Sequence, residues 1–274
     1  MLRNQLVCGV IVASLVCGCG AGSTPASRAA KAKVAADKEA SLAAVEPQLE
    51  AVPTQFEPGD ADFPRGAEAF AELVKSAQSN DGDGWAKSEA RLHELGASAT
   101  AAFAARLDDE NPVARELAAM FLAQIGPEAV SAASGLVKLL NDESAFARVN
   151  AAAALSTFEG YAEQVTPVLT ELLSDADESV RLTAATSLRN VGPAAAMSVT
   201  RLARALRDPN PQIRAAAAAT LGEIGPEAAK SLPVLRQLRA DTDEAVATAV
   251  ARAIRRLDET ARDTAGAIPA SATE

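Results

Sequence analysis

The sequence predicts an all-α protein built as a solenoid of about six stacked helical hairpins. Two observations predict this class. Hydrophobic residues make up 49% of the 274 residues but aromatic residues only 3%, because alanine supplies most of the apolar count. Alanine is the best helix former, is depleted in strands, and lets helices approach closely. In addition, one pattern of residues recurs every 33 positions along most of the chain.

The repeat is carried by columns of chemically similar residues. Four columns share the 33-residue step, and they are Asp109, Asp142, Asp175, Asp208 and Asp241; Arg115, Arg148, Arg181 and Arg214; Ala119, Ala152, Ala185, Ala218 and Ala251; and Leu122, Leu155, Leu188, Leu221 and Ile254. A second leucine column follows the same step at Leu136, Leu169, Leu202 and Leu235. Units of this length bury their apolar surface only against their neighbours, so the pattern indicates a repeat protein.

Each unit is predicted to form two helices, and specific residues mark where the helices begin and end. The aspartate precedes the second helix, where its carboxylate can accept from free helical N–H groups. Gly126-Pro127, Gly192-Pro193 and Gly225-Pro226 then end that helix, because glycine adopts positive φ and proline starts the next helix without an N–H to lose. Only one unit departs from this pattern and carries Glu159-Gly160 there.

The expected units begin near five residues, namely Trp85, Ala129, Ala162, Ala195 and Glu227. The first hairpin, Trp85–Leu107, is expected to be short, with residues 66–78 as a preceding cap helix. The last second helix, Glu244–Leu257, has Ala247 where the other units have arginine. Departures of this kind are typical of terminal capping repeats.

These residues resemble the HEAT repeat family, in particular the HEAT-like units of phycobilin lyases and their bacterial relatives. The pattern is visible from Asp208 through Ile213-Arg214, Ala217-Ala218 and Leu221 to Ile224-Gly225-Pro226. The resemblance covers residues 83–258. It implies a right-handed α-α superhelix in which the helices with the arginine line the concave side. It also implies that the aspartate and arginine columns bond to one another and to neighbouring turns, which makes them a structural ladder.

The first residues have the features of an export signal. Arg3 precedes an apolar run from Leu6 to Cys17 that is too short for a permanent membrane anchor. The sequence Val16-Cys17-Gly18-Cys19 resembles the lipobox of bacterial lipoproteins, in which the cysteine after a small residue is lipidated and becomes the new N-terminus. We therefore expect lipidation at Cys19 and an exported protein anchored to the cell envelope. In a Gram-negative cell, Gly20 would suit the periplasmic side of the outer membrane.

Composition divides the chain into four expected parts. They are a lipoprotein signal peptide at residues 1–18, a flexible tether rich in alanine and proline at 19–64, a HEAT-repeat domain at 65–262 and a flexible tail at 263–274. The three cysteines, Cys8, Cys17 and Cys19, all fall at or before the start of the tether. The folded part therefore offers no disulfide and no thiolate for catalysis or metal binding.

Charge argues against a nucleic-acid partner. The formal net charge is −10 at pH 7. Residues 19–176 hold 12 basic and 24 acidic residues, whereas residues 177–262 hold 13 basic and 10 acidic residues. Nonspecific nucleic-acid binding needs a positive field that displaces counterions, which the acidic front half does not supply. The basic back half could meet an acidic partner.

Candidate catalytic groups are few. His93 is the single histidine. One HEAT protein, deoxyhypusine hydroxylase, binds two irons through several His-Glu pairs, but a metal site needs three or more ligands, and His93-Glu94 is one pair. A lyase-like site would need an aromatic-lined, basic pocket, and the chain has one Trp and one Tyr. We expect no metal and no cofactor.

The remaining candidate is the strip of the second helices that points away from their apolar stripe. The strip's candidate partner-binding residues are Glu116, Met120, Val149, Ala153, Leu182, Thr186, Arg189 and Glu223. Met120, Val149 and Leu182 are apolar where solvated residues are expected, which indicates an interaction surface or, alternatively, contacts between units. The sequence thus favours a non-catalytic, lipid-anchored scaffold that binds another protein. The alternatives are a lyase-like or metal-dependent HEAT enzyme and an envelope spacer without a specific ligand.

Overall fold

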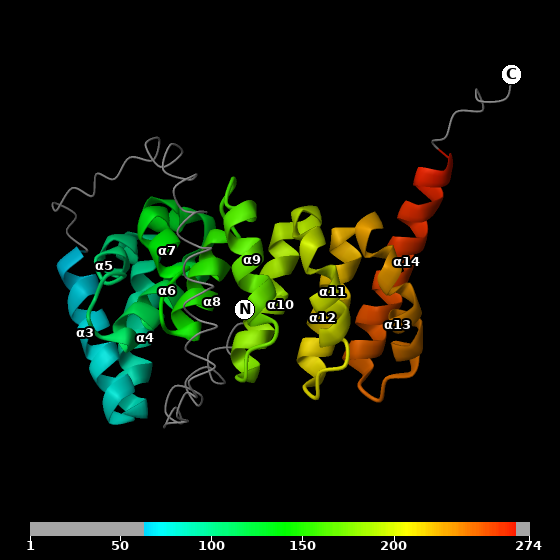
Figure 1. The fold of residues 1–274 in the computed structure, drawn as a ribbon. Coiled ribbons are helices and arrows are strands. Elements are labelled where there is room, and N and C mark those ends of the chain that lie inside the picture. The colour runs from blue at the N-terminus through cyan, green and yellow to red at the C-terminus, as the bar shows by residue number, and fades with distance from the viewer. Residues whose placement is uncertain (1–62, 267–274) are drawn as a thin grey trace, which may run out of the picture. The chain divides into compact units, whose positions relative to one another are not determined.

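The computed structural model describes residues 63–266, all of whose regular elements are helices (Figure 1). The predicted signal peptide, Cys19, the tether up to residue 62 and residues 267–274 of the tail lie outside the described residues. Contacts between residues divide the chain into two compact units, residues 1–101 and 102–274. Each unit is described separately.

Long and short helices alternate along the chain. The α-helices are α3 (Phe63–Ser79), α4 (Gly82–Leu95), α5 (Thr100–Ala104), α6 (Pro112–Ile125), α7 (Ala133–Leu139), α8 (Ala145–Leu155), α9 (Ala162–Leu172), α10 (Glu178–Val191), α11 (Val199–Ala205), α12 (Pro211–Ile224), α13 (Leu232–Gln237) and α14 (Glu244–Gly266). Short 3₁₀ segments occupy Gly96–Ala99, Gly126–Ala132, Gly192–Ser198, Pro226–Ser231 and Leu238–Ala240. In the described part, the helices pair in sequence as six hairpins, from α3–α4 to α13–α14.

The first unit contains a complete hairpin of α3 and α4. Phe70 and Leu73 of α3 are buried, as are Trp85 and Leu92 of α4. Asp81 caps α4 by accepting from the backbone N–H of Gly84 at 3.1 Å. The expected first hairpin, Trp85–Leu107, is therefore wrong. Its first half pairs backward with α3, because α3 presents its own apolar face to α4.

In the second unit, the repeat columns form the core. The alanine pairs of the second helices and the leucines of both helices are almost inaccessible to solvent. Neighbouring second helices pack directly on one another, α6 on α8, α10 on α12 and α12 on α14. Close approach depends on small side chains, since a Cβ added to Gly222 would lie 3.0 Å from the Cα of Ala253. An alanine-rich sequence thus gives a dense helical stack.

The ends of the second helices combine a confirmed expectation with a corrected one. Gly126, Gly192 and Gly225 end α6, α10 and α12 with φ of 75°, 66° and 83°, as their Gly-Pro pairs predict. The repeated aspartate, however, does not cap the following helix. Asp142 Oδ1 accepts from the N–H of Ser144 at 2.8 Å, and Ser144 in turn caps α8.

The first helices are shorter than the pattern suggests. After each Gly-Pro pair the chain forms a 3₁₀ segment before the α-helix, so α7, α11 and α13 have only seven, seven and six residues. The unit with Glu159-Gly160 differs, because α9 is continuous over 11 residues and contains Pro167. At the C-terminus, α14 reaches Gly266, four residues beyond the domain boundary expected at residue 262.

Candidate functional site

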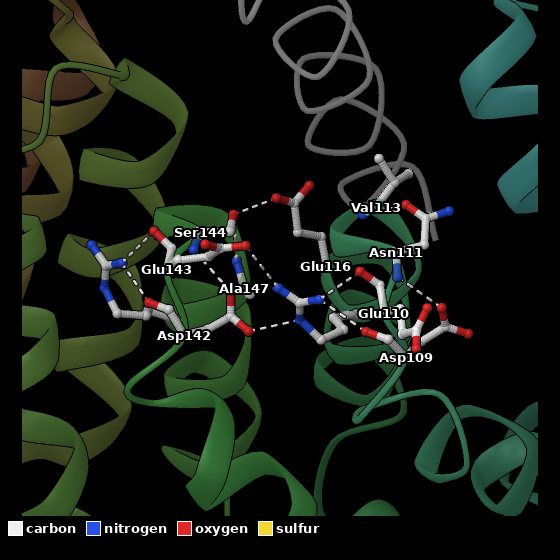
Figure 2. A network of polar contacts seen from close by, with 11 residues as sticks. Asp109, Glu110, Asn111, Val113, Glu116, Asp142, Glu143, Ser144 and Ala147 are labelled. Atoms are coloured by element: carbon white, nitrogen blue, oxygen red, sulfur yellow. Dashed lines mark hydrogen bonds and ion pairs between the residues drawn. The ribbon is translucent and has the colours of Figure 1, made fainter. Parts of the chain in front are cut away.

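The aspartate and arginine columns form bidentate rungs between successive repeats. Arg115 of α6 donates from Nε to Asp142 Oδ2 at 2.7 Å and from Nη2 to Asp142 Oδ1 at 3.2 Å (Figure 2). The equivalent pairs are Arg181 with Asp208 and Arg214 with Asp241, with Nε–Oδ2 distances of 2.8 and 2.9 Å. Their side chains are only 7–16% exposed. The planar guanidinium suits such paired contacts.

Each arginine also holds the loop of its own repeat. Arg115 Nη1 donates to the carbonyl oxygens of Asp109 at 2.8 Å and Glu110 at 3.3 Å. Arg148 Nη1 donates in the same way to the carbonyl oxygens of Asp142 at 2.8 Å and Glu143 at 3.1 Å. At the closed rungs these hydrogen bonds are made inside the fold, so their side chains are not open to a partner.

The rungs shift the pKa values of their members. The hydrogen bond to Asp142 raises the pKa of Arg115. Burial by itself would raise the pKa of Asp142, but the hydrogen bonds from Arg115 and from the N–H of Ser144 lower it overall. The pKa of Asp241 is lowered chiefly by its hydrogen bond from Arg214. Both carboxylates are therefore held in the charged form that the rung requires.

One rung of the ladder is open. Within residues 63–266, Arg148 makes no hydrogen bond or ion pair with Asp175, although both occupy their columns. Asp175 makes only the contact within its own loop, in which its Oδ1 accepts from the N–H of Asp177 at 2.9 Å. The second helices on either side of this rung, α8 and α10, also pack less extensively on one another than the other neighbouring second helices do.

Three of the predicted partner-binding residues are buried. Glu116, Met120 and Val149 are 7%, 4% and 1% exposed, so the expected apolar strip is not available on α6 and α8. The row faces the seam between the two helices, where Asn150 Nδ2 donates to the carbonyl of Glu116 at 3.3 Å. In this part of the strip, the alternative of contacts between units holds.

Glu116 is an ionisable group inside this seam. Its carboxylate accepts a hydrogen bond from Ser144 Oγ, the residue that caps α8 (Figure 2). Burial raises the pKa of Glu116, and the bond from Ser144 opposes the increase. The side chain therefore links α6 to the start of α8 instead of facing a ligand.

The accessible part of the strip lies farther along the second unit. Ala153, Leu182 and Thr186 are half-buried, and Arg189 and Glu223 are exposed. Thr186 Oγ1 donates to the carbonyl of Leu182 at 3.0 Å, and Glu223 pairs with Arg256 of α14. Steps of 33 residues continue the strip to α12 and α14. The accessible or half-buried positions on α10, α12 and α14, called here the free face, are Leu182, Thr186, Arg189, Ala215, Ala219, Glu223, Thr248, Arg252 and Arg255; Gly222 is buried against α14.

The sequence prediction missed the part of this face that α14 supplies. The predicted strip named no residue of α14, and its last member was Glu223. The period itself was sufficient to find the continuation, because Arg252 and Arg255 lie 33 residues after Ala219 and Gly222. Both arginines are exposed.

A groove adjoins the free face at the ends of α12 and α14. It has a volume of about 550 Å³ and is open to solvent. Its lining includes apolar surface from Pro193, Ala196, Ile224 and Pro226, together with the backbone of Gly222. The ion pair of Glu223 and Arg256 lies along it, beside Glu259 and Thr260. The groove and the free face share α12 and α14.

His93 lies on the exposed surface of α4. Its Nε2 is 3.9 Å from Glu89 Oε1, and Glu89 also accepts from Trp85 Nε1 at 3.1 Å. Among residues 63–266, no three His, Cys, Asp or Glu side chains are grouped to hold a metal ion. None of the helices between Phe63 and Gly266 has the length and apolar character that crossing a bilayer requires.

Comparison with protein families assigns the repeat. Residues 100–189 and 166–255 each match the family model of HEAT repeats, and together they span residues 100–255, more than half of the 274 residues. The chain belongs to the HEAT repeat family. Its HEAT repeats therefore include the four second helices α6, α8, α10 and α12 and most of α14. No curated protein matched the chain.

Solved structures agree on the fold. A crystal structure of an engineered protein is 25% identical, with a TM-score of 0.52, and the match covers 70% of this chain and 97% of that one. A designed armadillo repeat protein is 20% identical with a TM-score of 0.50, covering 70% and 99%. The CpcE–CpcF complex of phycocyanin lyase from Nostoc sp. PCC7120 is 26% identical with a TM-score of 0.47, covering 58% and 65%. The engineered protein and the designed armadillo repeat protein show that the chain is an all-α helical-repeat solenoid.

Proposed function

We propose that this HEAT protein is a lipid-anchored scaffold of the cell envelope that binds another protein through the free face and does no chemistry of its own. The single observation that carries the proposal is the free face itself. Nine positions on three successive second helices are accessible or half-accessible, whereas the closed rungs and the core are used internally.

The chemistry of the free face supports binding over catalysis. Leu182, Ala215 and Ala219 give half-exposed apolar surface, and Arg189, Arg252 and Arg255 give charge at its edges. Apolar surface with a charged rim is the usual composition of a protein interface. The free face carries no histidine or thiol that could act as a general base or nucleophile, and its one carboxylate, Glu223, is paired with Arg256.

The binding part of the proposal is tested by capture from solubilised envelope membranes. The bait is the full chain, compared with a double variant, Leu182→Asp with Ala219→Asp. Both positions are half-buried on the free face, so two carboxylates there should abolish capture of the specific partner. The matched control is Val130→Asp, because Val130 is 46% exposed and lies away from the free face. Equal capture by all three proteins would count against the free face, and absence of any specific protein would favour a spacer.

The anchoring part is tested at the cysteines. Metabolic labelling with a radioactive fatty acid should mark the wild-type protein and the variant Cys17→Ser, whereas Cys19→Ser should lose the label and its membrane association. Labelling that persists in Cys19→Ser would overturn lipidation at Cys19. Metal analysis of the purified chain tests the non-catalytic part, since stoichiometric iron or a bound chromophore would favour the enzyme alternative.

A further inference from the structure

The groove at the ends of α12 and α14 is negatively charged. Three carboxylates line it, from Glu223, Glu227 and Glu259, and Arg256 is the single cation among the described lining residues. All four side chains are exposed. Glu223 is paired with Arg256, whereas Glu227 and Glu259 make no ion pair within residues 63–266. The groove therefore presents two carboxylates whose charge is not compensated by a neighbouring side chain of the described part.

The end of α12 adds a second negative element to the groove. At the ends of α6 and α10, the terminal glycine donates its N–H to the carbonyl of Leu122 and of Leu188. In the described part, Gly225 makes no such bond to the equivalent residue, Leu221, and the 3₁₀ segment that follows begins one residue later, at Pro226. The last carbonyl groups of a helix carry partial negative charge and favour a cationic donor. This helix end lines the groove through Gly225.

The remaining lining of the groove is apolar. Ile224 is only 1% exposed, and Pro193, Ala196 and Pro226 lie around it. The volume of about 550 Å³ is sufficient for one or two apolar side chains. Burial of an apolar anchor in such a pocket is a common source of affinity, and charges at its rim then set specificity.

We propose that the groove binds a basic segment of the partner protein, with a lysine or arginine at Glu227 and Glu259 and an adjacent aliphatic side chain on the apolar lining. The inference rests on the proposed function and names the chemistry of the partner. The same carboxylates disfavour an acidic segment, because like charges repel. Three exposed arginines belong to the free face and do not line the groove, namely Arg189, Arg252 and Arg255.

The probe is a fluorescein-labelled, lysine-rich peptide with one central leucine, and its binding to the full chain in nonionic detergent is followed by fluorescence anisotropy. The same peptide with glutamate in place of lysine is the charge control. We expect the basic probe to bind at least about tenfold more tightly than the acidic one, and to weaken as salt is added. Equal binding of the two probes would overturn the proposal.

Two matched double variants separate the groove from the general negative charge of the chain, which is −10. Glu227→Lys with Glu259→Lys should weaken binding of the basic probe by about tenfold or more, whereas Glu128→Lys with Glu163→Lys should change it by less than about threefold. The charge change is the same in both variants. Glu128 occupies the position of Glu227 in an earlier repeat, and both control residues are exposed and lie outside the groove. Equal losses would show that the overall charge attracts the probe and would sink the assignment.

The apolar part of the groove has its own test. Replacing the leucine of the probe by glycine should weaken binding to the wild-type chain, and Ala196→Trp, which fills the groove, should remove that difference. A photoreactive leucine analogue in the probe should cross-link to residues 193–196 or 222–227, as mapped by mass spectrometry. Cross-links confined to other parts of the chain would contradict the location. Circular dichroism and thermal unfolding of each variant check that the fold is intact.

Failure of the inference remains distinct from failure of the proposed function. If the basic probe does not bind but Leu182→Asp with Ala219→Asp still abolishes capture of an envelope protein, the scaffold stands and the basic class of partner is wrong. If the probe does not bind and no envelope protein is captured, the scaffold itself is wrong. Where capture succeeds, Glu227→Lys with Glu259→Lys should lower it as well, and unchanged capture would count against the groove.

Discussion

Arg181 of α10 and Asp208, in the loop before α12, are joined by two hydrogen bonds, Nε to Oδ2 at 2.8 Å and Nη2 to Oδ1 at 3.3 Å. One repeat earlier, Arg148 makes no such bond to Asp175 within the described residues. The open rung coincides with the unit that lacks Gly-Pro and with the less extensive packing of α8 on α10. The packing between successive second helices is therefore weakest between α8 and α10.

The rungs should differ in their contribution to stability. Asp208→Ala removes a carboxylate that accepts two bonds from a half-buried guanidinium, and we expect it to cost about 1.5–3 kcal/mol of unfolding free energy. Asp175→Ala removes only the acceptor for the N–H of Asp177 and should cost about 0.5–1.5 kcal/mol. Urea unfolding of the full chain measures both. Equal losses would show that the open rung closes in solution.

Acid should weaken the closed rungs. The pKa values of Asp142 and Asp241 lie below the ordinary 3.8 in the folded chain. A lowered carboxylate pKa gives stability that is present above the unfolded pKa and is lost as pH falls through the folded pKa. We therefore expect the unfolding free energy to fall below about pH 4, and to fall less steeply in Asp142→Asn. Urea unfolding of the wild type and of Asp142→Asn across this pH range measures the difference.

Glu116 should have the opposite effect on the pH dependence of the unfolding free energy. Burial raises its pKa above the ordinary 4.5, against the bond from Ser144, so the folded chain binds this proton more tightly than the unfolded chain. The ionised carboxylate then costs stability at neutral pH, and this cost disappears as pH falls below the unfolded value. Glu116→Gln should consequently stabilise the protein at pH 7 and have little effect near pH 4. Urea unfolding of both proteins at the two pH values measures the difference; an equal effect of Glu116→Gln at pH 7 and pH 4 would remove burial of the charge as the cause.

The contact between α12 and α14 should be intolerant of added volume. A Cβ on Gly222 would lie 3.0 Å from Ala253 Cα and 3.2 Å from Ala253 Cβ, so Gly222→Ala must push the helices apart. We expect a cost of about 1–3 kcal/mol in thermal or urea unfolding. Gly82, where a Cβ would meet nothing within 4 Å, is the matched position, and Gly82→Ala should be neutral or slightly stabilising. A neutral Gly222→Ala would mean that the helices separate easily.

Sequence reasoning was most successful where a column repeats. The alanine and leucine columns are buried except for Ala251 in the last helix, and the Gly-Pro pairs end their helices. It failed at the first hairpin, because α3 carries none of the repeat's columns and was taken for a cap. It also placed the helix cap two residues early, at Asp142 instead of Ser144, since both residue types suit a cap and only the backbone geometry separates them.

The sequence by itself determined the period of the repeat, its helical hairpins and the identity of the ladder residues, because these depend on local preferences that recur every 33 positions. The tertiary structure alone decided which of those positions remain accessible. Met120 and Val149 are buried although they lie outside the apolar stripe of their own helices, because the neighbouring second helices cover a further side of each. It also decided which rungs close, since Arg115 of α6 reaches Asp142, 27 residues later in the chain, only when successive repeats pack together.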